Sequence, residues 1–169
     1  MQEALRAGEV EVALLYDLGL ADDLASIPLI DLTPYVLLPE GHPLAGKQHL
    51  TPQDLADQPM VLLSAPPSDE YFPGLLRDAG VEPRIAYRSS SFEMVRGLVG
   101  HGLGYALLAT SPAAAMTYDG RALVTRPLET GPRPGRPSRI VLAMRRGVPL
   151  SPAAEKLVWL CLDHFAVDD

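Results

Sequence analysis

The stretch that most constrains the fold of this chain is Ser89–Leu108, which predicts a helix, a glycine-rich turn and a buried strand in direct succession. Ser90 followed by Glu93 has the spacing of a capping box, in which the serine caps the first turn and the glutamate reaches back. Gly100 and Gly102 can supply the left-handed backbone that ends a helix. Tyr105–Leu108 then runs apolar, as in a strand covered on both faces. A helix followed so closely by a buried strand indicates an α/β protein.

The composition allows a sizeable core and argues against several classes of function. The chain has 169 residues, 47% of them hydrophobic, which suffices for one domain or two small lobes. Its net charge of −7 disfavours nonspecific nucleic-acid binding by the chain as a whole. The N-terminus has no apolar signal segment, and no apolar run approaches the length of a membrane span. The single cysteine, Cys161, fits a reducing cytoplasm, so we expect a cytoplasmic protein with no membrane partner.

The rest of the chain alternates short apolar strands with capped helices. The expected strands cover 10–16, 27–31, 35–39, 60–64, 84–88, 105–108, 123–128 and 139–145, and the expected helices cover 2–7, 51–57, 68–79, 90–100, 111–116 and 151–165. Strand 10–16 ends in a uniformly apolar run, which favours a parallel strand covered on both faces. The sequence before it is too short to supply a parallel neighbour, so the chain starts in the middle of an α/β pattern.

The sequence carries no catalytic or cofactor motif. None of the four histidines has a second histidine three or four positions further on, which a metal pair on a helix requires. There is no G-x-S-x-G nucleophile elbow. The glycines at 100, 102 and 104 do not complete G-x-G-x-x-G, and they follow a helix rather than a strand, which argues against a dinucleotide. We therefore expect no enzyme activity, no cofactor and no metal.

Serines follow two of the expected strands where each strand gives way to a helix. Strand 60–64 leads through Ser64 to a helix capped by Ser68, and strand 84–88 leads through Ser89 to a helix capped near Ser90 and Ser91. If the two strands are parallel neighbours, both helix starts lie at the edge where open α/β sheets bind ligands. Serine hydroxyls and free backbone N–H groups there suit a carboxylate or another small polar ligand.

Other residues near these helix starts bear on the ligand. Tyr71 and Phe92 are placed to supply an apolar wall, whereas Asp69 and Glu70 count against a strongly anionic ligand near the first helix. The alternative for each serine is an ordinary helix cap without a ligand. The alternative for the whole stretch 89–108 is one more α/β unit of a core.

Five blocks of the sequence come in an order that resembles the effector-binding domain of LysR-type transcriptional regulators. They begin with LRAGEVEVALL and include YVLLPEGHPLA and SFEMVRGLVGHGLGYALL, and they lie at 5–15, 35–45, 55–63, 91–108 and 150–155. Together they cover essentially the whole chain.

The resemblance implies an α/β fold of the type 2 periplasmic-binding-protein-like kind, with two α/β lobes joined by two crossing strands. It assigns 1–33 and 140–169 to an incomplete first lobe, 36–137 to a second lobe, and the crossings to about 32–38 and 138–145. It also implies a small-molecule effector in the cleft between the lobes. The residues that match cleft positions are Ser64, Ser68, Ser91 and Phe92, with Tyr16 placed to line the cleft floor.

The chain departs from the family's pattern on its N-terminal side. The winged helix-turn-helix and the linker helix are missing, as are the first strand, helix and second strand of the effector domain, so we expect an N-terminally truncated form. DNA would then be bound only through a domain that this chain lacks. The resemblance implies a homo-oligomer for the full-length form. The first lobe alone should be unstable, because strand 10–16 would expose an apolar edge.

Two other functions fit the same fold. A cytoplasmic or secreted solute-binding protein is disfavoured by the lack of a signal segment and by the single cysteine. An enzyme is disfavoured by the lack of a histidine and acid constellation. The sequence therefore predicts an effector-sensing domain of a LysR-type regulator.

Overall fold

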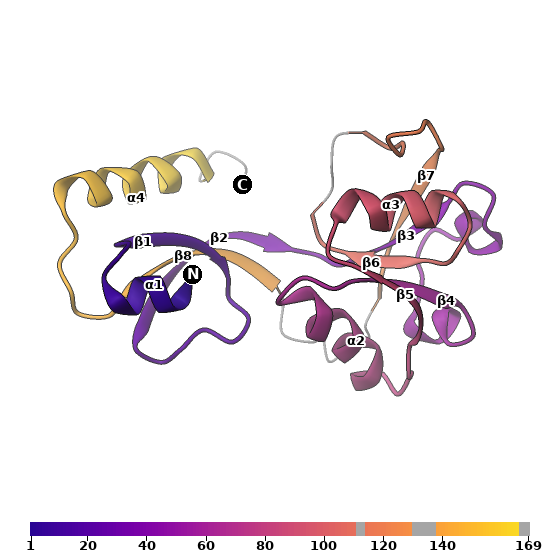
Figure 1. The fold of residues 1–169 in the computed structure, drawn as a ribbon, viewed down its shortest axis with the longest axis horizontal. Helices are drawn as coiled ribbons and strands as arrows, with labels where there is room; N and C mark the ends of the chain where they lie inside the picture. The colour runs from indigo at the N-terminus through magenta and orange to yellow at the C-terminus, as the bar shows by residue number, and fades with distance from the viewer. Residues whose placement is uncertain (111–113, 130–137, 166–169) are drawn as a thin grey trace. The chain divides into compact units, whose positions relative to one another are not determined.

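The structure is a computed structural model, which describes residues 1–110, 114–129 and 138–165 (Figure 1). The chain divides into two compact units. Unit 1 consists of Met1–Leu32 and Pro137–Asp169, and unit 2 consists of Thr33–Arg136. Each unit is described by itself below.

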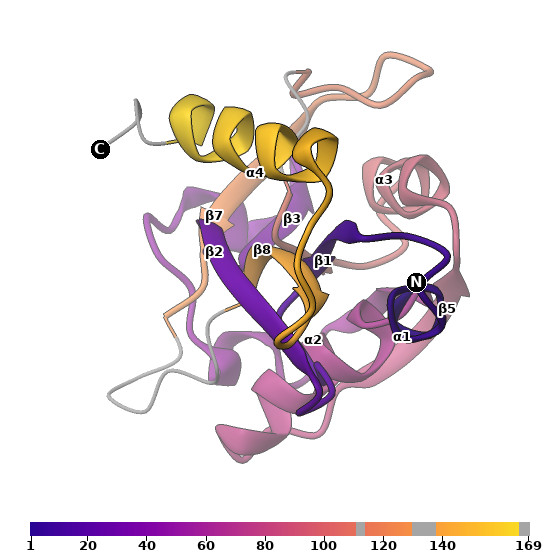
Figure 2. The ribbon, with the colours of Figure 1, turned by 90° about the vertical axis from the view of Figure 1, so that its left-hand side faces the viewer.

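Unit 1 is a three-stranded antiparallel sheet with a helix on each side (Figures 1 and 2). Its sheet order is β1-β8-β2. The elements are α1 (Gln2–Ala7), β1 (Val12–Tyr16), β2 (Leu24–Leu32), β8 (Ser138–Arg145) and α4 (Pro152–Phe165). Helix α1 ends as the sequence predicts, because Gly8 takes the left-handed conformation at φ 75° and its N–H bonds back into the last turn.

The expectation of a parallel, doubly covered strand at 10–16 is wrong in the described structure. β1 pairs antiparallel with β8, with Ala13 opposite Ala143. One face of the strand packs on Leu5 of α1 through Ala13, but Leu14, which points to the other face, is 56% exposed. Helix α4 has no buried residue of its own, and Leu14 stays exposed, so the apolar run of β1 is covered on one face only.

Unit 2 is a five-stranded mixed sheet. Its strands are β3 (Tyr35–Pro39), β4 (Pro59–Leu63), β5 (Arg84–Ser89), β6 (Ala106–Leu108) and β7 (Leu123–Pro127). β3 pairs antiparallel with both β6 and β7, and β4 pairs parallel with β5. A parallel bridge between Met60 and Tyr105 joins the two parts, with Tyr105 N–H donating to the carbonyl of Pro59 at 2.9 Å. The order is therefore β5-β4-β6-β3-β7.

Two helices cover opposite faces of this sheet, α2 (Ser68–Asp78) and α3 (Phe92–Gly100) (Figure 1). Successive strand residues point to opposite faces, so each strand contributes to two cores. The core on the α2 side contains Val36, Leu38, Met60, Leu62, Phe72, Leu76, Tyr105 and Leu107. The core on the α3 side contains Leu37, Val61, Val95, Val99, Ala106 and Leu108. The doubly buried strand expected at 105–108 is thus confirmed.

Two short 3₁₀ helices, η1 (Pro43–Gly46) and η2 (Pro52–Leu55), complete the elements of unit 2. The helix expected at 111–116 is not found where the structure describes this segment. Residues 111–113 lie outside the described residues, and 114–116 are not helical. None of the helices that the structure describes is both long enough and apolar enough to span a membrane.

Gly104 permits the close approach of β6 to β4. Its φ is +154°, and a Cβ atom at this position would lie 2.2 Å from the carbonyl oxygen of Pro59. That oxygen accepts the N–H of Tyr105, so neither strand can move away without losing the bridge. Any side chain at position 104 would therefore break the junction between the two parts of the sheet.

We predict that Gly104→Ala destabilises the protein by roughly 3 kcal/mol or more, because the backbone clash adds to the strain of positive φ. Gly80→Ala is the matched control. Gly80 has φ 79° with no atom within 4 Å of the added Cβ, so only about 1–2 kcal/mol of strain is expected. Urea denaturation measures both values. Equal losses for the two variants would contradict the close approach at Gly104.

Helix α4 is attached to the start of β1 by Glu11. The Glu11 carboxylate accepts the N–H of Ser151 at 2.9 Å and its hydroxyl at 2.6 Å. The Ser151 hydroxyl, and after it the Ser151 backbone N–H, lower the pKa of Glu11 below its ordinary value of 4.5. Because the folded-state pKa is lowered, the stabilisation is present above pH 4.5 and is lost as the pH falls through the folded pKa.

We therefore expect Glu11→Gln to reduce the free energy of unfolding at pH 7, and the difference from wild type to shrink as the pH is lowered below about 4.5. Unfolding measured from pH 7 to pH 3 tests this expectation. Glu9→Gln, which alters a neighbouring acid, should keep the pH dependence of the wild type. A wild-type and Glu11→Gln difference that stays constant over this range would contradict the role of the Glu11 charge.

Candidate functional site

The carboxyl ends of β4 and β5 lie side by side in unit 2, and a helix begins from each. Leu63 lies opposite Ser89 in the parallel register, and the N–H of Ser64 donates to the carbonyl of Ser89 at 2.8 Å. The condition that the sequence left open, a parallel pairing of these two strands, is therefore met. Both helix starts consequently lie at the edge of the sheet where α/β folds bind ligands.

The start of α3 carries two serine hydroxyls. Ser91 is the N-cap, and its Oγ accepts the N–H of Met94 at 3.3 Å. Ser89 Oγ accepts the N–H of Ser91 at 3.1 Å. The amides of Phe92 and Glu93, in the first turn, have no helical acceptor and donate to no other described residue. This end of α3 therefore offers two free N–H groups beside two hydroxyls.

The capping box predicted from Ser90 and Glu93 is wrong. The helix begins one residue later than that spacing assumes, so the cap is Ser91 and the residue three positions on is Met94. Glu93 pairs instead with Arg96, whose Nε lies 3.1 Å from Glu93 Oε1. The run of three serines at 89–91 leaves the sequence ambiguous about which of them caps the helix.

The start of α2 is built differently, and Ser68 does not cap it. Ser68 is the first helical residue, and the cap position belongs to Pro67, which has no side-chain acceptor. The N–H of Ser68 donates to Ala65 O at 2.7 Å, and the N–H of Tyr71 donates to Pro67 O at 3.0 Å. These amides are already hydrogen-bonded within the protein, and the first turn of α2 carries acidic residues. The start of α2 is therefore less suited to bind an anion than the start of α3.

Ser64 follows β4 at the same edge. Its hydroxyl oxygen is buried and has no hydrogen-bond partner among the described residues. A buried hydroxyl without a partner costs free energy, and such groups in native proteins frequently mark functional sites or ordered water. Among the serines at this edge, Ser64 is therefore the one whose hydroxyl lacks a hydrogen-bond partner within the described protein.

The aromatic residues of the predicted site fall on different faces of the sheet. Tyr71 packs against the α2-side core and contacts the Phe72 ring at a centroid distance of 5.2 Å. Phe92 packs against the α3-side core. Tyr16 belongs to unit 1, where it ends β1 opposite Ile140 and is 36% exposed. Within unit 2, the structure therefore groups Ser64, Ser91 and Phe92 with the carboxyl edge and places Ser68 and Tyr71 on the neighbouring helix.

Sequence reasoning missed the contribution of β6 to this edge. β6 runs parallel to β4 through the Met60–Tyr105 bridge, so the chain leaving β6 emerges at the same edge as Ser64 and Ser89. The carbonyl of Thr110 in that chain accepts the hydroxyl of Tyr35 at 2.8 Å. The strand itself was expected at 105–108, but its parallel pairing with β4 was not recognisable from so short an apolar run.

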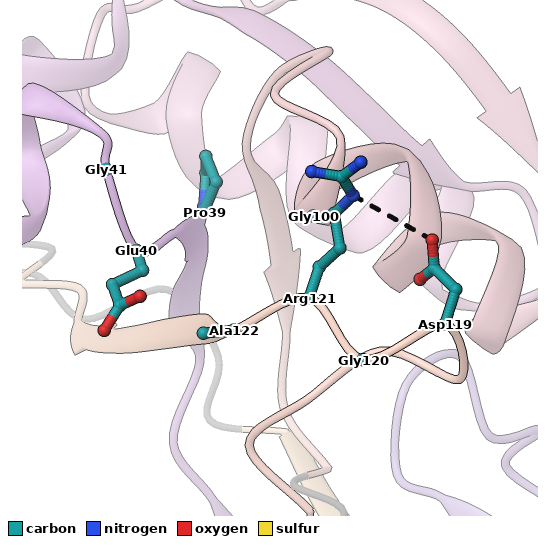
Figure 3. Close-up of a pocket in the computed structure, with 8 residues that line it drawn as sticks. All are labelled: Pro39, Glu40, Gly41, Gly100, Asp119, Gly120, Arg121 and Ala122. Atoms are coloured by element: carbon teal, nitrogen blue, oxygen red, sulfur yellow. Dashed lines mark ion pairs between the residues drawn. The ribbon is translucent and has the colours of Figure 1, made fainter.

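A separate hollow of about 460 Å³ lies at the C-terminal end of α3 (Figure 3). It is lined by Pro39, Glu40, Gly41, Gly100, Asp119, Gly120, Arg121 and Ala122. Figure 3 shows Arg121 directed toward Asp119, with its Nε 3.9 Å from the carboxylate, and Glu40 directed away from that pair. The Thr117 hydroxyl, followed by His101 at 2.8 Å, lowers the pKa of Asp119.

The charged groups of this hollow are largely engaged with one another, and they are of mixed sign. The hollow therefore fits a structural network that attaches the turn 117–121 to the end of α3. No cluster of three or more potential metal ligands occurs in the part of the chain that the structure describes. The carboxyl edge of β4, β5 and β6 is the better candidate for ligand binding.

The fold and the site together define a two-unit α/β protein of the type 2 periplasmic-binding-protein-like class. The chain belongs to the LysR substrate-binding domain family, because the model of the LysR substrate binding domain matches residues 1–166. The fold expected from the sequence and the resemblance to LysR-type regulators are thus confirmed.

Individual relatives support this assignment. The C-terminal domain of a probable LysR family transcriptional regulator from Rhodococcus sp. RHA1 is 38% identical, with a TM-score of 0.88 over 95% of this chain and 78% of that one. The HTH-type transcriptional regulator AlsR of Bacillus subtilis is 30% identical over 70% of this chain and 40% of its own length. The effector binding domain of QuiR in complex with shikimate has the same fold, with a TM-score of 0.79 at 18% identity over 98% of this chain and 77% of that one. The chain spans about half or less of the curated relatives it matches.

The two serines at the helix starts should differ in their effect on stability. Ser91→Ala removes a helix cap and should lower the free energy of unfolding by about 1 kcal/mol. Ser68→Ala removes no capping bond and should change it by less than about 0.5 kcal/mol. Chemical denaturation of both variants tests the corrected cap assignment. A larger loss for Ser68→Ala than for Ser91→Ala would contradict it.

Proposed function

We propose that this chain is the effector-sensing part of a LysR-type transcriptional regulator and that its effector is a small molecule with a carboxylate. The carboxylate binds at the carboxyl edge of β4, β5 and β6, against the start of α3. The observation that carries the proposal is the pair of unoccupied amides at Phe92 and Glu93, set beside the hydroxyls of Ser89 and Ser91.

Physical chemistry supports an anion at this position. The first-turn N–H groups and the helix dipole both favour negative charge. Ser89 and Ser91 use their oxygens as acceptors within the turn, so their hydroxyl protons are available to donate outward. The buried Ser64 hydroxyl lies one residue beyond the neighbouring strand and would gain its missing partner from a polar ligand.

The acidic start of α2 adds a constraint on the remainder of the effector. Asp69 and Glu70 lie in the first turn of α2, at the same sheet edge. They favour hydrogen-bond donors on the ligand, such as hydroxyl or ammonium groups, over a second carboxylate. A compact hydroxy acid or amino acid satisfies both helix starts, and the QuiR domain, which shares this fold, is in complex with shikimate.

The wider arrangement follows from the same family membership. We propose on that basis that units 1 and 2 correspond to the two lobes, and that Ser68 and Tyr71 of α2 contribute to the effector site. We further propose that this part works in a cytoplasmic regulator of the family, in which a separate domain binds DNA and the protein is a homo-oligomer. Effector binding changes regulation only if the effector binds two conformational states of the protein with different affinities.

Isothermal titration with sodium benzoate and sodium shikimate, with benzamide as the uncharged control, tests the site. Ser91→Ala should weaken binding of the carboxylates about tenfold or more, since it removes a hydrogen bond to a charged group. Ser151→Ala is the matched control, because Ser151 caps α4 with the same 3.3 Å bond to Ala154 N–H and lies in unit 1. Equal effects of the two variants, or no binding of any carboxylate, would contradict the proposal.

A further inference from the structure

Arg96 is the one buried charged residue in the part of the chain that the structure describes, with 3% of its surface exposed. It lies on α3, about one turn after the Ser91 cap. Burial of a guanidinium is unfavourable unless the group is hydrogen-bonded and paired. Its partners therefore show what the burial of this charge accomplishes.

Two of those partners are backbone carbonyls from outside the helix. Arg96 Nη2 donates to Ala114 O at 2.8 Å and to Met116 O at 2.5 Å. Both carbonyls belong to the chain that leaves the carboxyl end of β6, which Tyr35 also holds through Thr110 O. Arg96 thus fixes this chain to α3, the helix whose start forms the candidate site.

The third partner is Glu93, an acid in the first turn of α3. Arg96 Nε lies 3.1 Å from Oε1 of Glu93 as an ion pair without hydrogen-bond geometry, and Glu93 supplies one of the two free amides at the start of α3. An unpaired carboxylate in this first turn would oppose an anion bound there by like-charge repulsion. The positive charge of Arg96 offsets that repulsion from within the protein.

We infer that Arg96 is a positioning and specificity residue of the effector site. It anchors the chain that follows β6, and it neutralises Glu93 so that the start of α3 accepts a carboxylate. The first part depends only on the structure of unit 2, and the second rests on the proposed function. Arg96 acts through Glu93 and the anchored chain, without touching the effector.

The test of the second part is the ratio of the dissociation constants for sodium benzoate and benzamide. Arg96→Met should raise this ratio about two- to five-fold, the size of a single charge effect in the first turn of a helix. Arg96→Lys, which keeps the charge, should leave the ratio near that of the wild type. Glu93→Gln combined with Arg96→Met should restore it, because the repelling charge is gone.

The matched control is Arg126→Met. Arg126 also donates to backbone carbonyls, those of Ala45, Lys47 and Thr125, but it pairs with no acid of the candidate site. Its loss should leave the benzoate to benzamide ratio unchanged even if the variant is less stable. A ratio that Arg96→Met does not raise, or that Arg126→Met raises equally, would overturn the role in specificity.

Amide hydrogen exchange tests the anchoring without any ligand. The N–H groups of Thr117 and Leu123 are bonded to Arg121 O and Ala115 O at 2.9 Å each, so they report the order of the anchored chain. Arg96→Met should speed their exchange about tenfold or more relative to Arg126→Met. Unchanged exchange would overturn the anchoring. If wild type binds neither probe, the carboxylate proposal fails while this measurement still decides the anchoring.

Discussion

The parallel pairing of β4 with β5 is the interaction on which the site depends. The hydrogen bond from Ser64 N–H to Ser89 O holds the carboxyl ends of the two strands in register, so that both strands end at the same edge of the sheet. Two helices must then start from one edge, and the free amides at the start of α3 lie at that edge. An antiparallel pairing of the same segments would place the helix starts at opposite edges and leave no shared site.

The second constraint is the close contact between β4 and β6 at Gly104. It adds a third parallel strand to the edge and joins the two parts of the sheet in unit 2. The chain that leaves β6 then has to be held against α3, and the buried charge of Arg96 accomplishes this. The β4–β6 contact and the hydrogen bonds of Arg96 therefore hold the sheet together and also shape the candidate site.

Much of this architecture was predictable from the sequence, because strands and helix ends follow from local features, namely apolar runs and glycines. The strand at 35–39 has the expected bounds, and the buried strand around Ala106 and the turn at Gly8 were also anticipated. The caps were predictable only approximately. Consecutive serines offer several registers for α3, and Pro67 displaced Ser68 from the cap of α2. The antiparallel pairing of β1 and the burial of Arg96 depend on residues distant in sequence, which local patterns do not encode.

The central claim is that an anion binds at the start of α3 rather than at the hollow at its other end. Titration of the ¹⁵N-labelled chain with sodium benzoate, followed through amide chemical shifts, tests this claim most directly. The account predicts that the largest shifts occur at the amides of residues 89–93 and at Ser64. Largest shifts at Gly41 and residues 119–122, which line the hollow, or shifts confined to unit 1, would contradict it.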